Sequence, residues 1–311
     1  MNIKIIKLKN QGFCYGVTRA IDIAVKSTNN PSLPRPIYLL GNIVHNDHIS
    51  LLLDSLNIIT IEGNNRLEML DKVQNGATVI FSAHGVSDKV RLKAKAKNLM
   101  IVDAICPYVE KTFGLIADEV DKGNEIFYIG KKNHPETEAV TELSNHVHVV
   151  DNELLEAKLP YNNIKIANQT TMSRYDINET LKDIKNVYPK AELLDMVCKV
   201  TENRQKELAD TLNNLSSSNT LTIIVGDKKS NNSTKLYELA QRSPNTEAVF
   251  VESIEDLSFN NIKKYNTIVI ASGTSTPMAL INEIEENIKN IDNIKEDRIK
   301  SSITINDLKN N

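Results

Sequence analysis

Three cysteines are the residues whose type and spacing most clearly indicate chemistry. Cys14, Cys106 and Cys198 are the only cysteines among 311 residues, and each lies 92 residues from the next. Their odd number leaves one unpaired in any disulfide scheme, and no C-x-x-C pair indicates a zinc ribbon or thioredoxin motif. They are therefore inert core thiols or ligands that the fold assembles. Three thiolates suit an iron–sulfur cluster or zinc, and a cubane with three protein ligands leaves one iron open to substrate.

Imidazole and carboxyl groups follow several apolar runs. His45 in GNIVHN, His84 in SAHGVS, and His134 with Glu136 in NHPE stand at predicted strand ends. A single histidine there is usually a structural hydrogen-bonding group, but three at equivalent places favour a functional interpretation. Glu136 could donate a proton if its pKa is raised. The alternative is a solvated loop acid.

Three loops are rich in short hydrogen-bond donors. They are QTT (169–171), SNNST (230–234) and SGTST (272–276), and they contain Thr170, Ser230 and Ser275. Such residues commonly cap helices, but a helix N-terminus with hydroxyl and amide donors also binds anions, especially phosphate. Together with His45 and His84, these loops predict a diphosphate pocket.

The elements that must position these residues form a threefold repeat. Each cysteine follows an apolar run (3–13, 98–105, 191–197) and precedes a stretch with helical period (16–26, 107–120, 199–212). Further apolar runs end in glycine or small polar residues, at 37–46, 125–136 and 220–233 and again at 78–87, 164–173 and 267–277. Each third of the chain is therefore predicted to alternate strands with helices.

This alternation predicts an α/β protein with mostly parallel sheets, in which ligands bind outside the carboxyl ends of the strands. We expect three pseudo-threefold-related units, at 1–97, 98–190 and 191–290, whose loops surround a central iron–sulfur cluster. The polar C-terminal tail, 291–311, carries no structural prediction.

Composition narrows the function classes. The chain is 41% apolar and 25% charged, which is typical of globular proteins. A net charge of −3 and scattered basic residues argue against nucleic-acid or anionic-membrane partners. The N-terminus has no continuous apolar signal segment, and no run approaches eighteen apolar residues, so we expect a cytoplasmic protein.

Nine segments in order resemble the 4-hydroxy-3-methylbut-2-enyl diphosphate reductase family (IspH/LytB) of the non-mevalonate isoprenoid pathway. Across residues 3–285 they are GFCYGVTRAI, GNIVHN, FSAHGVSDKVR, DAICPYVEK, IGKKNHPE, NQTTMS, VCKVTENRQ, KKSNNS and SGTSTP. The resemblance implies an oxygen-sensitive [4Fe–4S] cluster on the three cysteines. It also implies an allylic diphosphate alcohol as substrate, whose hydroxyl binds the open iron. Two electrons, from a donor such as ferredoxin or flavodoxin, then drive C–O cleavage to isopentenyl or dimethylallyl diphosphate.

The resemblance also assigns roles to individual residues. Glu136 would be the proton donor, assisted by His134 and Thr170. The diphosphate would be held by His45, His84, Ser230, Asn232 and Ser275, with Asn231 between two of them.

The chain departs from the family pattern at five positions. Asn231 stands where a second serine is common. Thr137 and Ala139 replace the customary Val and Gly after Glu136, and an alanine could shift this loop if the glycine has positive φ. Met196 and Val200 flank the third cysteine. We expect these changes to affect rates more than the reaction.

Two other functions are compatible with the residues alone. A cluster-based redox or iron sensor would need the cysteines but not Glu136. A cluster hydro-lyase would use the open iron without an electron source.

Overall fold

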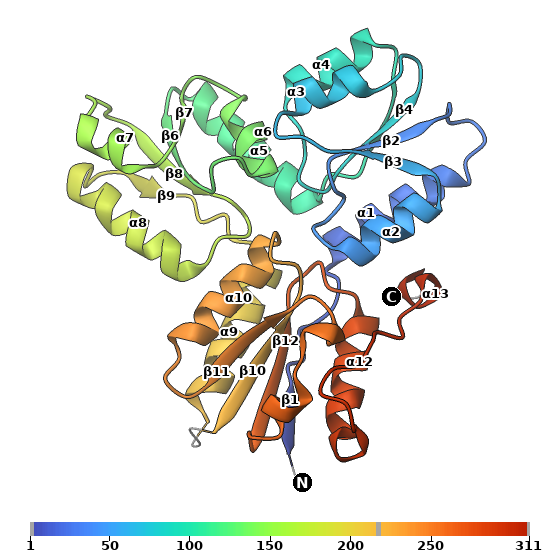
Figure 1. Ribbon diagram of the computed structural model, residues 1–311. Coiled ribbons are helices and arrows are strands. Elements are labelled where there is room, and N and C mark those ends of the chain that lie inside the picture. Colours follow the sequence, from blue (N-terminus) through green and yellow to red (C-terminus); the bar gives the residue numbers. More distant parts are fainter. Residues whose placement is uncertain (1–2, 216–218, 310–311) are drawn as a thin grey trace. The chain divides into compact units, whose positions relative to one another are not determined.

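The computed structural model describes residues 3–215 and 219–309, which form three four-stranded sheets (Figure 1). Every strand pair in these residues is parallel, as the alternation of strands and helices predicted. The chain divides into two compact units. We call residues 16–43 and 53–198 the two-sheet unit, and the described parts of 1–15, 44–52 and 199–311 the one-sheet unit.

The first sheet of the two-sheet unit has the order β3-β2-β4-β5. Its strands are β2 (Ile37–Leu40), β3 (Ile58–Ile61), β4 (Thr78–Phe81) and β5 (Met100–Asp103). The associated helices are α1 (Tyr15–Thr28), α3 (Arg66–Met69), the 3-10 turn η1 (Leu70–Lys72) and α4 (Asp88–Ala96). A further helix, α2 (Asp47–Ser55), begins in the one-sheet unit and ends in this unit. Leu40, Val79 and Phe81 pack against Met69 and Val90 of the helices. This contact buries one face of the sheet.

The second sheet of the same unit has the order β7-β6-β8-β9. Its strands are β6 (Glu125–Ile129), β7 (Val147–Val149), β8 (Ile164–Asn168) and β9 (Glu192–Leu193). The helices are α5 (Pro107–Asp121), α6 (Pro135–Thr141), α7 (Asn152–Ala157) and α8 (Arg174–Val187). Phe127 packs with Ile177 of α8, whereas its neighbour Tyr128 packs with Ile116 of α5 and Val140 of α6. Because successive strand residues point to opposite faces, helices cover both faces of this sheet.

The sheet of the one-sheet unit has the order β1-β12-β10-β11. Its strands are β1 (Lys4–Lys7), β10 (Thr220–Val225), β11 (Glu247–Val251) and β12 (Thr267–Ser272). The helical elements are α9 (Lys199–Asn213), α10 (Asn231–Arg242), η2 (Ile254–Asp256), α11 (Phe259–Ile262), α12 (Met278–Lys289), η3 (Ile291–Asn293) and α13 (Ile305–Lys309). All residues of β10 and β12 are buried, which explains why both are rich in β-branched and apolar residues and show no alternation of apolar and charged positions.

The strand before each cysteine lies at the edge of a sheet. β1 pairs with β12, β5 with β4, and β9 with β8. Each cysteine therefore follows a strand that closes one sheet and precedes the helix that begins the next α/β segment. The limits 1–97, 98–190 and 191–290 stay a prediction.

The sequence did not predict β3, β7 or β11. All three are edge strands of three to five residues, and each leaves at least one residue partly exposed. Short, half-exposed runs give little apolar periodicity, which is why they were missed.

The tail beyond residue 290, for which no structure was predicted, packs onto its own unit. Ile294, Ile299 and Ile303 contact the apolar cluster beneath α12. The Glu283 carboxylate accepts hydrogen bonds from the Ser302 N–H at 2.5 Å and the Ser301 hydroxyl at 2.9 Å. These contacts hold the tail up to α13.

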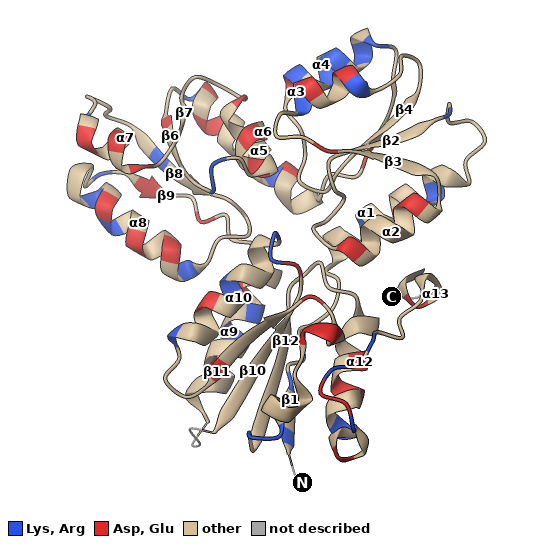
Figure 2. Ribbon diagram, in the orientation of Figure 1, with Lys and Arg blue, Asp and Glu red and all other residues tan. Residues whose placement is uncertain are grey.

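Charged residues lie mostly on helices and loops, and both signs are mixed on α8 (Figure 2). None of the helices in the described ranges has the length and apolar character that a membrane crossing requires. The cytoplasmic location stays a prediction.

Candidate active site

Glu136 is the central acid of the two-sheet unit. It is the second residue of α6 and is only 1% exposed. Its Oε1 accepts hydrogen bonds from the Thr170 N–H at 2.8 Å and the Tyr128 hydroxyl at 3.2 Å. Its Oε2 accepts one from the Thr170 hydroxyl at 2.9 Å. Burial raises the pKa of Glu136 to about 7, although these three hydrogen bonds oppose the shift. A carboxyl group with this pKa can hold and release a proton near neutrality.

Two cysteines lie near this acid. Cys106 precedes the first turn of α5, where Pro107 begins the helix. Burial raises the pKa of the Cys106 thiol, while the N–H groups of Tyr108 and Val109 oppose the shift. The nearby Cys198 and Glu136 raise the same pKa through their negative charge. The Cys198 N–H donates to the carbonyl oxygen of Thr170 at 2.9 Å. Thr170 therefore connects the buried acid to one cysteine.

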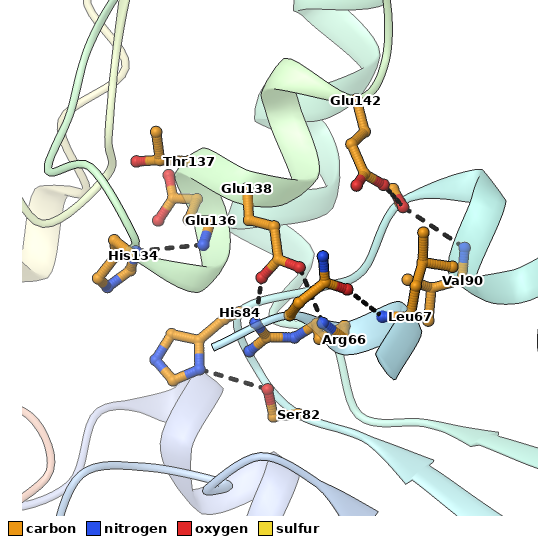
Figure 3. A network of polar contacts seen from close by, with 12 residues as sticks. Arg66, Leu67, Ser82, His84, Val90, His134, Glu136, Thr137, Glu138 and Glu142 are labelled. Atoms are coloured by element: carbon orange, nitrogen blue, oxygen red, sulfur yellow. Dashed lines mark hydrogen bonds and ion pairs between the residues drawn. The ribbon is translucent and has the colours of Figure 1, made fainter. Parts of the chain in front are cut away.

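His134 and His84 form an imidazole pair in the same unit. His134 caps α6, and its Nδ1 accepts a hydrogen bond from the Glu136 N–H at 3.1 Å. Because Nδ1 is the acceptor, a neutral His134 ring carries its proton on Nε2. The His84 ring lies edge-on to it with ring centroids 5.5 Å apart, and Ser82 Oγ lies 3.3 Å from His84 Nδ1 (Figure 3). The sequence prediction that these residues lie together is consistent with this arrangement.

Tyr128 is a site residue that sequence reasoning missed. It is fully buried in β6, and burial, followed by the Glu136 charge, raises its pKa well above the usual value. A Cβ at Gly130 would lie 2.6 Å from Cε1 of the Tyr128 ring, so glycine makes room for the ring. The available signal was a tyrosine inside a buried strand, because a buried phenol needs a hydrogen-bond partner.

The one-sheet unit brings together the donor-rich loops after β10 and β12. Ser230 is the N-cap residue of the twelve-residue helix α10, but its side chain makes no capping hydrogen bond. The Ser275 hydroxyl donates to Ser230 Oγ at 3.1 Å. The Asn232 Nδ2 donates to Thr274 Oγ1 at 2.7 Å, and its Oδ1 accepts from the Thr201 hydroxyl at 2.9 Å. These contacts surround a helix N-terminus with hydroxyl and amide groups, an arrangement that suits an anion.

Arg204 connects the segment that precedes Cys14 to the loop after β12. The buried guanidinium donates to the carbonyl oxygens of Ser272 and Gly273 at 2.9 and 2.8 Å, and to that of Gly12 at 2.6 Å. The Cys14 N–H donates to the carbonyl oxygen of Thr274 at 3.3 Å. Cys14 is thus held beside the donor loops. His45 belongs to the same unit and lies just before α2.

The cysteines fit the chemistry of cluster ligands. All three cysteines are partly exposed residues. The N–H groups of the first turn of α5 favour the Cys106 thiolate, the form that binds iron, although burial raises the pKa of this thiol overall. The two-sheet unit supplies two of the three cysteines, and no three of its described His, Cys, Asp or Glu side chains make a complete metal site by themselves.

A family model described as "LytB protein" matches residues 5–289. The chain belongs to the LytB protein family. It is 40% identical over 288 residues to a 4-hydroxy-3-methylbut-2-enyl diphosphate reductase of Symbiobacterium thermophilum, covering 91% of this chain and 96% of that protein. It is also 40% identical over 295 residues to the protein of that name in Macrococcus caseolyticus, covering 93% and 90%.

Solved structures agree with this LytB membership. The E-1-hydroxy-2-methyl-but-2-enyl-4-diphosphate reductase of Plasmodium falciparum matches with a TM-score of 0.82 and 32% identity, over 92% of this chain and 88% of that one. A second structure, described as (E)-4-hydroxy-3-methyl-but-2-enyl diphosphate reductase, the terminal enzyme of the non-mevalonate pathway, matches with a TM-score of 0.65 and 26% identity. It covers 93% and 99% of the two chains.

The departures of this LytB chain can be located in the structure. Ala139 lies inside α6 and has no positive φ, so the sequence-based concern about a shifted loop does not apply. Thr137 is buried on the same helix, near Gly130. Asn231 is the buried first residue of α10, beside Ser230. Met196 packs in the cluster beneath α5 and α6.

Proposed function

We propose that this protein catalyses the reductive dehydroxylation of (E)-4-hydroxy-3-methylbut-2-enyl diphosphate to isopentenyl diphosphate and dimethylallyl diphosphate. Family membership and the names of its relatives support the proposal. The observation that carries it in this chain is Glu136, a buried acid whose pKa is raised to about 7 beside Thr170 and Cys106. Such an acid can deliver protons in a site without bulk water.

The reaction consumes two electrons and two protons. One proton leaves with the substrate hydroxyl as water when the C–O bond breaks, and the other forms the new C–H bond at either end of the allyl group. We propose Glu136 as the proton donor. Thr170 holds its carboxyl group through two hydrogen bonds, and the Nδ1 of His134 accepts from its N–H.

We further propose that Cys14, Cys106 and Cys198 ligate one [4Fe–4S] cluster. When bound, such a cluster supplies electrons and a Lewis-acidic iron with one open coordination position. A small redox protein such as ferredoxin or flavodoxin is the proposed electron donor.

For the substrate's diphosphate, we propose binding by Ser230, Asn232 and Ser275 at the start of α10, together with His45, His84 and Asn231. The hydrogen bonds that already join Ser275 to Ser230 and Thr274 to Asn232 support this assignment, because they hold the hydroxyl and amide groups in place before an anion arrives.

Anaerobically purified protein with measured iron and sulfide content tests the proposal. With a reduced dye as electron donor, the wild type should consume the allylic diphosphate and release both products. Glu136→Gln should lower kcat by about 100-fold or more at unchanged cluster content, since a general acid contributes about 10²–10⁴-fold. Cys106→Ser should lower iron content. Glu156→Gln, on the exposed face of α7, is the matched acid control and should behave as wild type.

Three outcomes would contradict this function. Absence of turnover at full cluster loading would exclude it. Conversion without any electron source would favour a hydro-lyase. If Glu136→Gln functions as the wild type does while Cys106→Ser loses function, a cluster-based sensor would be favoured.

A further inference from the structure

We infer that Arg66 and Ser87 are positioning residues that clamp α6 from its outer face and so place Glu136 for proton transfer. The inference rests on the proposed function, in which Glu136 donates the proton. Neither residue belongs to the predicted catalytic or binding groups. Both act through other carboxylates of the α6 segment.

The acids of α6 point in two directions. Glu138 and Glu142 are four residues apart and therefore share one face of the helix, whereas Glu136 is two residues from Glu138 and points to nearly the opposite face. Glu136 contacts Tyr128 of β6 and Thr170 after β8. The Glu138 carboxyl is instead directed at Arg66 (Figure 3). The helix thus presents one acid to the site and two to the neighbouring α/β layer.

The first contact that holds α6 is an ion pair between Arg66 and Glu138, which lie 72 residues apart in the sequence. Arg66 Nη1 donates to Glu138 Oε2 at 2.7 Å, and the Arg66 backbone N–H donates to Oε1 at 2.9 Å. Arg66 is only 5% exposed. Burial lowers the pKa of its guanidinium, while the Glu138 charge opposes the shift. Asn65 fixes this position, because its Oδ1 accepts from the N–H groups of Leu67 and Glu68 and so caps α3.

The second attachment lies beside the His84 loop. The Ser87 hydroxyl donates to Glu142 Oε2, and Ser87 also caps α4 by accepting from the Val90 N–H. Residues 82–87 form the loop between β4 and α4 that carries His84. The same contacts that hold α6 therefore hold this loop, and the 5.5 Å ring contact between His84 and His134 spans the two.

This clamp matters because α6 has only seven residues. A helix of this length is not stable by itself, so its position depends on tertiary contacts. The proposed reaction delivers a proton to one of two allyl carbons, and small displacements of a catalytic group lower rates steeply. Loosening α6 should therefore reduce kcat and also change the ratio of isopentenyl to dimethylallyl diphosphate. Simple loss of folded protein would lower the rate without changing that ratio.

The test compares Arg66→Ala, Glu138→Gln and the double variant as cluster-loaded enzymes. We expect each single variant to lower kcat by about tenfold or more and to shift the product ratio, and the double variant to add little. Arg66→Lys, which keeps the charge, should recover part of kcat. Lys182→Ala is the control, because Lys182 makes an exposed ion pair with Glu179 on α8 of the same unit.

Hydrogen exchange supplies a readout that does not need activity. In Arg66→Ala, the amides of 82–88 and 135–142 should exchange faster than in wild type, with the rest of the two-sheet unit unchanged. If Arg66→Ala does not fold, Glu138→Gln, which keeps the side-chain shape, replaces it. Unchanged exchange together with an unchanged product ratio would overturn the clamp. Absence of wild-type turnover would instead overturn the proposed function, and exchange would still test the clamp.

Discussion

Replacing Glu136 by glutamine removes one ionisable group while preserving its shape. The glutamine Oε1 can still accept from the Thr170 N–H and the Tyr128 hydroxyl, as the glutamate Oε1 does. The new NH₂ group occupies the place of Oε2 and can donate to Thr170 Oγ1, which lies 2.9 Å from it. A protonated Glu136 would make the same contact. Glu136→Gln is therefore a permanent copy of the neutral acid.

The change in folding stability that Glu136→Gln causes follows from the raised pKa of Glu136. In the folded protein the pKa is about 7 instead of the ordinary 4.5, so the folded state binds this proton more tightly than the unfolded state. The corresponding stabilisation is fully present below pH 4.5 and is lost as the pH rises through 7. This difference between the folded and unfolded pKa values corresponds to about 3 kcal/mol in the free energy of unfolding. At pH 8 the glutamine variant should therefore be more stable than wild type by about 3 kcal/mol, with little difference at pH 4.5.

The assay is urea unfolding of wild type and variant at several pH values between 4.5 and 8.5. Iron-free protein is the appropriate sample, because the charge of a cluster would itself shift nearby pKa values. Glu207→Gln is a control for which the change in stability at high pH should have the opposite sign. Burial opposes ionisation of Glu207, but hydrogen bonds from Lys9 and Asn10 lower its pKa overall. Its stabilisation is present at high pH, so this variant should lose stability there. If the difference in unfolding free energy between Glu136→Gln and wild type does not change with pH, the reasoning is refuted.

Three further predictions concern single contacts. Tyr128→Phe removes a hydrogen bond that lowers the pKa of Glu136, so the infrared band of the protonated carboxyl should titrate at a higher pH than in wild type, and an unchanged midpoint would contradict the assigned contact. Gly273→Ala would place a Cβ 2.0 Å from Ser233 Oγ and should lower the free energy of unfolding by about 1–3 kcal/mol in urea titrations, with partial relief by Ser233→Ala. Arg204→Met leaves three backbone carbonyl oxygens without their donor and should lower both thermal stability and iron content, whereas loss of neither would argue against its role beside Cys14.

Much of the fold could be predicted because the central strands of parallel sheets are buried on both faces. The runs at β4, β8 and β12 are mostly apolar and end in polar loops, so the strands and the loops that follow them could be recognised in the sequence. The edge strands β3, β7 and β11 were not visible, because partial exposure dilutes the apolar pattern. Tyr128 was missed because a tyrosine in a strand reads as a packing residue until its partner is known.

The sequence by itself determined the types and order of the chemical groups: three equally spaced cysteines, loops of short donors after apolar runs, and an acid in a histidine-proline-glutamate turn. These depend on local composition and periodicity, which survive without tertiary structure. Only the tertiary structure decided which strands share a sheet, why Glu136 has a pKa of about 7, and how Arg66 reaches Glu138 across 72 residues. Burial and long-range pairing set these properties, because both are made by residues far apart in the chain.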